Sequence, residues 1–306
     1  MKIAILLATY MGERYIGEQI ESVIKQTYQD WMIYVHDDGS TDKTMDIVQS
    51  YVERYPNKIQ ILEGPALGGA RNNFMYLLSQ VEASYYMCCD QDDIWLPEKI
   101  EKTYNAMKQL EAENEVKVPC MIYTDLTVVD GNLNIIADSM SMYQNLNCAN
   151  VSIGRLLMQN VVTGCTMMLN KELRDMVIQY KNIDNIIMHD WWAAIIAALF
   201  GRLIYLNDPM IWYRQHGSNS VGAIDTHSFS YAIRKLFQTS GNKQAVQATW
   251  TQAQELVDTF SLAPESVPAI LASAKKLPKW QRIRLYRKNN LNKVGFARNL
   301  GLIIWG

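Results

Sequence analysis

The first 90 residues alternate short apolar runs with longer stretches in which apolar positions recur at helical spacing. A glycine-rich turn at residues 64–69 interrupts this alternation once. Alternating strands and helices are typical of a parallel sheet wound with helices on both faces. We therefore expect an α/β fold with a Rossmann-like, mostly parallel central sheet flanked by helices. The predicted elements are strand 2–9, helix 18–26, strand 31–35, helix 44–54, strand 59–62, helix 71–79 and strand 85–89.

The pattern changes after residue 120, where strands and helices no longer alternate regularly. Helices are predicted to fill much of the chain beyond residue 220, and no repeat or low-complexity linker divides it. We expect one α/β domain of residues 1–220 and a helical C-terminal extension of residues 221–306. The elements predicted in the second half of the domain are strands 121–124, 133–137, 163–169 and 203–206 and helices 153–159 and 189–200.

Polar motifs follow three of the predicted strands: Thr9-Tyr10, residues 37–42 and residues 90–93. Because ligands of open parallel sheets bind at the carboxyl ends of the strands, we expect these motifs to meet at one edge. In the last motif, Asp90 and Asp92 flank a glutamine directly after an apolar strand. Carboxylates, with substrate phosphate oxygens completing the shell, suit Mg²⁺ or Mn²⁺. Acidic triplets are also common in surface loops, but the place of this one after the fourth strand favours a metal site.

The motif at residues 37–42 has two compatible interpretations. Gly39 supplies a turn, and one of the polar residues after it caps the next helix. A carboxylate at a strand end can also accept the N3 hydrogen of a uracil or thymine base. Asp38, beside the glycine turn, is the candidate for this base-reading role.

Seven short motifs occur in a fixed order over residues 1–220. Their order and spacing resemble the inverting, nucleotide-sugar-dependent family 2 glycosyltransferases of the GT-A fold, and most closely the rhamnosyltransferase-like bacterial members. The resemblance implies that residues 1–220 form a glycosyltransferase catalytic domain. The motifs are Leu7-Ala8-Thr9-Tyr10 with Glu13 and Ile16, His36-Asp37-Asp38-Gly39-Ser40-Thr41-Asp42, Gly68-Gly69-Ala70-Arg71-Asn72-Asn73, Cys89-Asp90-Gln91-Asp92-Asp93-Ile94-Trp95, Thr163-Gly164-Cys165-Thr166, His189-Asp190-Trp191-Trp192 and Tyr213-Arg214-Gln215-His216-Gly217-Ser218-Asn219.

The resemblance implies a role for several residues at the nucleotide. Asp38 matches the acid that reads the pyrimidine, and Asp90 matches the first acid of the DxD motif, near the ribose and the metal. Arg71 matches a basic residue near the nucleotide and diphosphate. The alternative is that Arg71 lies on a helix surface without a ligand. The first loop that lines the nucleotide is matched by Thr9, Tyr10 and Glu13.

For the metal and the reaction, the resemblance implies four further residues. Asp92 matches the ligand of Mn²⁺ or Mg²⁺, which stabilises the leaving nucleoside diphosphate. Arg214 and His216 lie where related enzymes contact the metal or diphosphate. For His216, the alternative is a purely structural role. Asp190 matches the catalytic base, with His189 in place of the more usual acid; capping the helix that follows is compatible with that role.

These matches predict a metal-dependent inverting transfer of a sugar to a hydroxyl of a bacterial cell-surface glycan precursor, lipid-linked in our interpretation. The expected donor is dTDP-L-rhamnose, with UDP-glucose, UDP-galactose or UDP-GlcNAc as the alternative. A non-catalytic nucleotide-sugar-binding protein is the alternative of another class, and the presence of both Asp92 and Asp190 argues against it. A Rossmann oxidoreductase is excluded because no GxGxxG follows the first strand.

Charge changes this picture at the C-terminus. The 306 residues carry a net charge of −2, but no acidic residue follows Glu265 whereas nine basic residues do. Tryptophans such as Trp280 are interleaved with these bases, a composition that suits a membrane interface. We expect this segment to make a peripheral contact with an anionic membrane. There are three alternatives: a solvated basic helix, docking of the segment on the acidic part of the same chain, and a homodimer through the apolar residues of the segment. No nucleic-acid-binding motif accompanies the bases.

The cysteine pattern and the apolar runs bear on location. Five cysteines, without a CxxC motif, indicate neither a disulfide framework nor a zinc site and favour a reducing compartment. The apolar run after Lys2 is too short for a signal peptide, and no run is long enough to span a bilayer. We therefore expect a cytoplasmic protein that is peripheral at the cytoplasmic face of the cell membrane.

Overall fold

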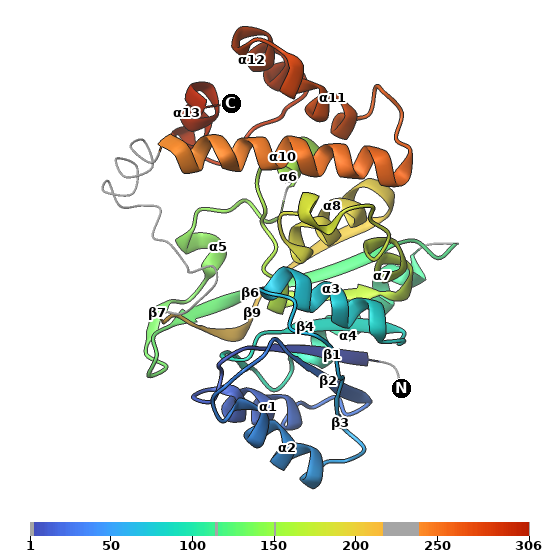
Figure 1. Ribbon diagram of the computed structural model, residues 1–306, viewed down its shortest axis with the longest axis vertical. Coiled ribbons are helices and arrows are strands. Elements are labelled where there is room, and N and C mark those ends of the chain that lie inside the picture. The colour runs from blue at the N-terminus through green and yellow to red at the C-terminus, as the bar shows by residue number, and fades with distance from the viewer. Residues whose placement is uncertain (1–2, 114–115, 150, 217–238, 306) are drawn as a thin grey trace. The chain divides into compact units, whose positions relative to one another are not determined.

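The computed structural model describes residues 3–113, 116–149, 151–216 and 239–305 (Figure 1). The end of the last motif, Gly217-Ser218-Asn219, and the predicted domain boundary at residue 220 lie outside these residues. The chain divides into two compact units that are each discontinuous in sequence. Unit 1 comprises Met1–Met140, Val162–Ile178 and Ile196–Ala223, and unit 2 comprises Ser141–Val161, Gln179–Ile195 and Ile224–Gly306.

Unit 1 is built on a nine-stranded sheet with the strand order β3-β2-β1-β4-β8-β6-β9-β5, and β7 pairs with β6. Strands β1 to β4 are mutually parallel, as the alternation predicted. The remaining strands mix the two directions, with β8 antiparallel to both β4 and β6 and β9 parallel to β6. The strands are β1 (Ile3–Thr9), β2 (Trp31–Asp37), β3 (Ile59–Ile61), β4 (Tyr85–Cys89), β5 (Ile94–Trp95), β6 (Cys120–Val129), β7 (Ile135–Ala137), β8 (Met167–Asn170) and β9 (Arg202–Arg214).

Helices cover both faces of the parallel strands. Figure 1 shows α1 (Ile16–Ile24) and α2 (Thr44–Arg54) on one side of β1 and β2, and α3 (Ala70–Gln80) on the other. This arrangement follows from right-handed crossovers in a sheet whose order reverses direction at β1. Strand β1 is apolar on both faces because both faces are covered. Its register with β2 sets Thr9 opposite Asp37, so the polar strand ends lie side by side.

Two predictions for the rest of unit 1 need correction. The predicted strand 163–169 is a 3₁₀ turn, Gly164–Thr166, followed by β8. The predicted strand 203–206 continues to Arg214, because a shift of register opposite Asp125 accommodates Pro209. Helices α4 (Lys99–Ala112) and α7 (Lys171–Val177) were not predicted. Helix α4 is largely polar, and its buried stripe of Ile100, Met107 and Leu110 is narrow, so its periodicity is weak in the sequence.

Unit 2 is helical, and α10 (Thr239–Phe260) contacts most of its other elements. Figure 1 shows α11 (Val267–Ser273), α12 (Lys279–Lys288) and α13 (Phe296–Trp305) on one side of α10. The buried residues Val246, Trp250, Ala253 and Leu256 recur at helical spacing along α10 and form its packed face. The Trp250 indole donates a hydrogen bond to the Tyr286 hydroxyl, which joins α10 to α12 (Nε1 to O, 2.8 Å).

The other elements of unit 2 come from the segments before residue 196. They include α6 (Ile153–Met158), the 3₁₀ turn Ile183–Asn185 and the first half of α8 (His189–Phe200), while α5 (Met140–Tyr143) begins at the unit boundary. Buried Glu255 of α10 accepts hydrogen bonds from the backbone N–H groups of Lys181 and Asn182. In the described part of the chain, no helix is long and apolar enough to cross a membrane. All five cysteines are buried.

Candidate functional site

Three loops meet at the carboxyl ends of β1, β2 and β4, as the sequence predicted. The Thr9 hydroxyl donates a hydrogen bond to Asp37 (Oγ1 to Oδ1, 2.8 Å), and the Met11 backbone N–H donates to the Ser40 hydroxyl (N to Oγ, 2.8 Å). These contacts join the first loop to the loop after β2. The side chain of Tyr10 is 58% exposed beside them, so its ring is accessible to a ligand.

Gln91, the central residue of the DxD motif, holds the first loop to the third. Its amide oxygen accepts a hydrogen bond from the backbone N–H of Tyr10, and its amide nitrogen donates to the backbone carbonyl of Tyr10, both at 2.8 Å. Gly12 makes room for this clamp, since a Cβ atom there would lie 2.2 Å from Gln91 Oε1. Gln91 was not among the predicted site residues, although its place between two aspartates is a signal in the sequence.

The two aspartates at the end of β2 form different hydrogen bonds. The Asp37 carboxylate accepts hydrogen bonds from the backbone N–H groups of Gly39 and Ser40 and so closes its own turn. The Asp38 carboxylate accepts three, from the backbone N–H groups of residues 67, 68 and 69 (2.5, 2.9 and 2.7 Å). It therefore fixes the glycine-rich loop. Asp38 Oδ2 accepts only one of the three bonds, which leaves it able to accept another from a base.

Glu13 and Arg71 contact the N-terminal ends of two helices. The Glu13 carboxylate accepts a hydrogen bond from the backbone N–H of Lys43 (Oε2 to N, 3.0 Å), directly before α2. Arg71 is half-buried in the first turn of α3, where its Nε donates to Asn72 Oδ1 (2.9 Å). Helix N-termini carry partial positive charge, so the start of α3 and Arg71 together favour an anionic ligand.

Asp92 and His216 form a direct contact between the DxD loop and the segment after β9. Asp92 Oδ2 lies 2.8 Å from His216 Nε2, and the two side chains are 15% and 17% exposed. The His216 ring packs against Tyr15, with 5.1 Å between ring centroids. A carboxylate oxygen and an imidazole nitrogen at this separation suit two neighbouring positions in the shell of one divalent ion with bonds of about 2.1 Å.

Arg214 is buried behind this pair. Its guanidinium donates three hydrogen bonds within the protein, to the Asp92 backbone carbonyl (2.9 Å), the Gly131 carbonyl (3.0 Å) and the Glu18 carboxylate (2.5 Å). Arg214 therefore positions the backbone that carries Asp92. Its predicted contact with a diphosphate stays a prediction.

A second group of possible metal ligands lies deeper: Asp90, Asp93 and Cys165 have ligand atoms within 4.8 Å of one another. Burial raises the pKa of Asp93, with the charges of Asp92 and Asp90 adding to the effect, and burial also raises the pKa of the Cys165 thiol well above its usual value. Asp93 and Cys165 are fully buried, whereas Asp92 and His216 are partly exposed. The Asp92 and His216 pair is therefore the more accessible position for an ion.

Lys99 is buried in the same region of unit 1 and was not predicted. Its ammonium group lies 4.1 Å from the centre of the Trp95 ring, and burial lowers the pKa of Lys99 to about 8. The neighbouring thiol and carboxyl groups favour the charged form of this lysine only when they are ionised, and burial outweighs them.

Asp190 lies in the first turn of α8, within unit 2. The helix begins at His189, so Asp190 is not the residue that precedes the helix. Its Oδ1 accepts hydrogen bonds from the Asn160 side-chain amide (3.1 Å) and from the Trp191 backbone N–H (2.5 Å). Burial lowers the pKa of His189 to about 3, so this histidine is neutral at pH 7. Trp192 belongs to the core, where it stacks on Phe260 with 6.3 Å between ring centroids.

Comparison with known proteins decides the family. Residues 4–144 match the family described as Glycosyl transferase family 2. The dTDP-rhamnosyl transferase RfbG of Shigella flexneri is 31% identical over 229 residues, which cover 71% of this chain and 74% of that protein. The chain belongs to glycosyltransferase family 2. It is therefore a glycosyltransferase, and its similarity to RfbG agrees with the resemblance seen in its motifs.

Solved structures of GT-A glycosyltransferases share the fold of this family 2 member. Staphylococcus aureus TarS 1–349 in complex with UDP-GlcNAc superposes with a TM-score of 0.56 at 19% identity, over 95% of this chain and 88% of that one. The mannosyltransferase PcManGT of Pyrobaculum calidifontis, in complex with GDP-Man and Mn²⁺, superposes with a TM-score of 0.53 at 15% identity, over 99% and 86%. The predicted GT-A fold is thereby confirmed.

Proposed function

We propose that this glycosyltransferase transfers L-rhamnose from dTDP-L-rhamnose to a hydroxyl of a lipid-linked precursor of a bacterial cell-surface glycan. The observation that carries the proposal is the convergence of three strand-end motifs at the edge where parallel sheets bind nucleotides. Hydrogen bonds of Thr9 and Gln91 hold these motifs together. The similarity to a protein named dTDP-rhamnosyl transferase supports the choice of donor.

In this proposal the donor binds to unit 1. Tyr10 and Arg71 offer an accessible ring and a cation, and Asp38 accepts the N3 hydrogen of the pyrimidine through Oδ2. Thr9 and Glu13 shape the loop that lines the nucleotide, and Asp90 contacts the ribose. Asp92 and His216 hold a Mn²⁺ or Mg²⁺ ion, which when bound supplies positive charge to the diphosphate of the departing nucleotide.

Asp190 is the proposed catalytic base. Its carboxylate takes the proton of the acceptor hydroxyl while that oxygen forms a bond to the anomeric carbon. The bond from that carbon to the diphosphate oxygen breaks on the opposite side, and the electron pair leaves with the nucleoside diphosphate, which gives inversion. Asn160 and the N-terminus of α8 favour the charged carboxylate.

The basic tail, residues 275–306, is proposed to contact the anionic cytoplasmic face of the membrane. Some of its bases stabilise the fold: Lys279 donates to the Ile304 carbonyl (3.0 Å), and Arg282 lies over the Trp250 ring. Five others are exposed, and the described residues offer them no ion-pair partner. The five are Lys275, Lys276, Arg284, Arg287 and Lys288.

A UDP-hexose or UDP-GlcNAc is the second candidate donor. The base-reading contact assigned to Asp38 uses N3–H, which uracil and thymine share, so this contact does not separate the two nucleotides.

For the basic tail, the alternative to membrane contact is a homodimer through the apolar residues of the tail.

The test is release of nucleoside diphosphate from a panel of dTDP- and UDP-sugars with Mn²⁺, Mg²⁺ or EDTA and a crude lipid-linked glycan acceptor. We expect metal-dependent release from dTDP-L-rhamnose, lost in Asp92→Asn and kept in Asp46→Asn, which removes an exposed carboxylate from α2. Calorimetric titration with dTDP, with and without Mn²⁺, reports binding independently of turnover. Release from a UDP-sugar alone would replace the proposed donor, and binding without turnover of any donor would favour a nucleotide-sugar-binding protein.

A further inference from the structure

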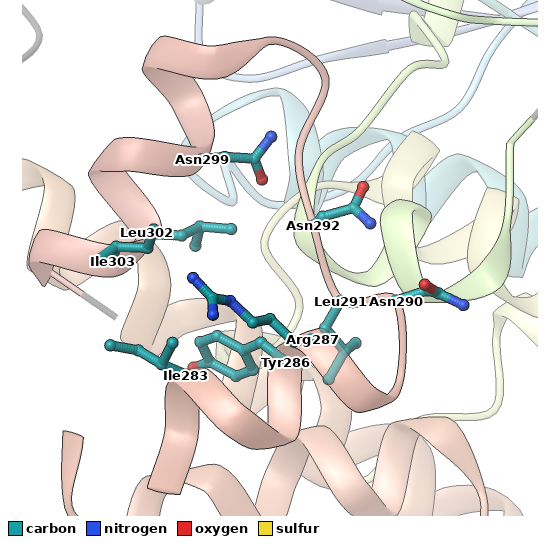
Figure 2. Close-up of a pocket in the computed structure, with 9 residues that line it drawn as sticks. All are labelled: Ile283, Tyr286, Arg287, Asn290, Leu291, Asn292, Asn299, Leu302 and Ile303. Atoms are coloured by element: carbon teal, nitrogen blue, oxygen red, sulfur yellow. The ribbon is translucent and has the colours of Figure 1, made fainter. Parts of the chain in front are cut away.

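A cavity of about 310 Å³ opens within the basic tail, in unit 2. Figure 2 shows its walls: α12 contributes Ile283, Tyr286 and Arg287, and α13 contributes Asn299, Leu302 and Ile303. The turn between the two helices supplies the remaining wall, including Leu291. A volume near 300 Å³ is at the lower end of the range for small-molecule sites.

The walls combine aliphatic surface with one unpaired cation. Ile283, Leu291 and Leu302 are buried, so the apolar side of the cavity is a fixed part of the fold. Arg287 is exposed, and Figure 2 shows its side chain extending from α12 into the space that faces α13. Its guanidinium forms no hydrogen bond or ion pair with the described residues, and the sequence contains no acid after Glu265. The cavity therefore offers an anion-binding group beside an apolar pocket.

Two apolar side chains near the cavity are exposed to water. Trp280, in the first turn of α12, is 82% exposed, and Ile303, which lines the cavity, is 40% exposed. An exposed indole beside cations is typical of a segment at a membrane interface. The exposed bases Arg284 and Lys288 on the same helix add positive charge around the opening. The charge and the apolar surface together fit an amphiphile that carries a phosphate.

We propose that this cavity binds one phosphate-bearing lipid, with Arg287 at the phosphate and the aliphatic walls around the first part of a hydrocarbon chain. The inference rests on the proposed membrane contact of the basic tail and gives that contact a defined binding site. A free phosphate would use only Arg287 and leave the apolar wall exposed to water. A lipid uses both, because its phosphate and its chain are adjacent in one molecule.

The test measures saturable binding of a soluble lipid to the full-length protein by isothermal titration calorimetry. The probes are dihexanoyl phosphatidylglycerol below its micelle concentration, dihexanoyl phosphatidylcholine and inorganic phosphate. Arg287→Gln removes the cation from the cavity, and Arg284→Gln is the matched control, since it removes an exposed cation of the same helix that does not line the cavity. Ile303→Trp fills the cavity without changing the charge.

We expect saturable binding of phosphatidylglycerol, weakened at least tenfold in Arg287→Gln, less than twofold in Arg284→Gln and lost in Ile303→Trp. Equal weakening by the two glutamine variants would overturn the site, as would inorganic phosphate binding as tightly as the lipid. Absence of saturable binding to the wild type would overturn it too. Sedimentation of the same samples tests a second copy as the occupant: a dimer that dissociates in Ile303→Trp would overturn the lipid assignment.

Vesicle binding separates failure of this site from failure of the membrane contact. Wild-type protein is sedimented with phosphatidylcholine vesicles that contain or lack phosphatidylglycerol, alongside the two glutamine variants. Binding to anionic vesicles that both variants weaken equally would leave the membrane contact intact and remove the cavity as a specific site. Absence of wild-type binding to anionic vesicles would contradict the membrane contact itself.

Discussion

In unit 1, the motifs after β1, β2 and β4 form the edge where we propose that the donor binds, called here the donor edge. The polar groups of this edge and those of the basic tail in unit 2 differ in their hydrogen bonding. At the donor edge, Asp37, Asp38 and Gln91 are bonded to the protein's own backbone. In the basic tail, exposed cations such as Arg284 and Arg287 have no partner among the described residues. Loops that are already ordered lose little entropy on binding a small ligand. Unpaired cations act at longer range, and salt screens them. The first arrangement suits precise recognition, and the second suits attraction to an anionic surface.

The largest expected effect tests whether the two units divide the reaction, with donor binding in unit 1 and proton removal in unit 2. Asp190→Asn keeps the shape of the side chain but removes the base, so turnover should fall about 10²–10⁴-fold while the affinity for dTDP stays unchanged. The matched control is Asp184→Asn, which removes an exposed carboxylate from unit 2. Turnover close to wild type, or a parallel loss of dTDP affinity, would contradict this division. Initial rates and calorimetric titrations with dTDP provide the two readings.

The second prediction concerns the buried histidine of α8, His189. The pKa of His189 is about 3 in the folded protein and about 6.5 in the unfolded chain, so the unfolded chain binds this proton more tightly. Stability from this group is complete above pH 6.5 and falls by up to about 1.4 kcal/mol per pH unit as the pH drops from 6.5 toward 3. We expect His189→Gln to lose this component of the acid sensitivity. Urea unfolding at pH 7.5 and pH 5.5 measures it, and an unchanged pH dependence would contradict the assignment.

The third prediction concerns the hydrogen bonds between Gln91 and Tyr10 at the donor edge. Gln91→Glu replaces the amide donor to the Tyr10 carbonyl with a carboxylate oxygen, which that carbonyl repels. We expect affinity for dTDP to fall about tenfold, consistent with the loss of one hydrogen bond of about 1 kcal/mol and the repulsion. Gly12→Ala should act in the same direction because its Cβ would displace Gln91. The control is Gln80→Glu, at the exposed end of α3. Normal dTDP affinity in both site variants would show that the clamp does not organise the nucleotide site.

The smallest expected effect on stability concerns the exposed indole of the basic tail. Trp280→Ala should change the free energy of unfolding by less than about 0.5 kcal/mol, because the ring is largely in water. The binding of the Trp280→Ala variant to anionic vesicles should nevertheless be weaker than that of the wild type. Trp250→Ala, which truncates a buried indole of α10, should by contrast destabilise the protein by about 3–5 kcal/mol. Comparable destabilisation by the two variants would show that Trp280 packs on the protein.

The local pattern determined a large part of the fold. The bounds of α2 and β4 agree with the prediction, and β1, β2, β3 and α3 differ from it by a few residues at their ends. Alternating periodicity is a property of neighbouring residues, so it survives in a single sequence. The motifs at the ends of β1, β2 and β4 were likewise visible, and their order was enough to recognise the family.

Only the tertiary structure decided what each functional side chain contacts. Gln91 reaches Tyr10, 81 residues earlier, and Arg214 reaches Glu18, 196 residues earlier. Arg214 has the sequence features of an anion-binding residue, yet it lies inside the protein as a support for Asp92. The sequence showed nine bases at the C-terminus, but the structure separated those that hold the helices from those that are exposed and unpaired. Secondary structure follows from local spacing, whereas the partner of a polar group depends on how distant elements pack.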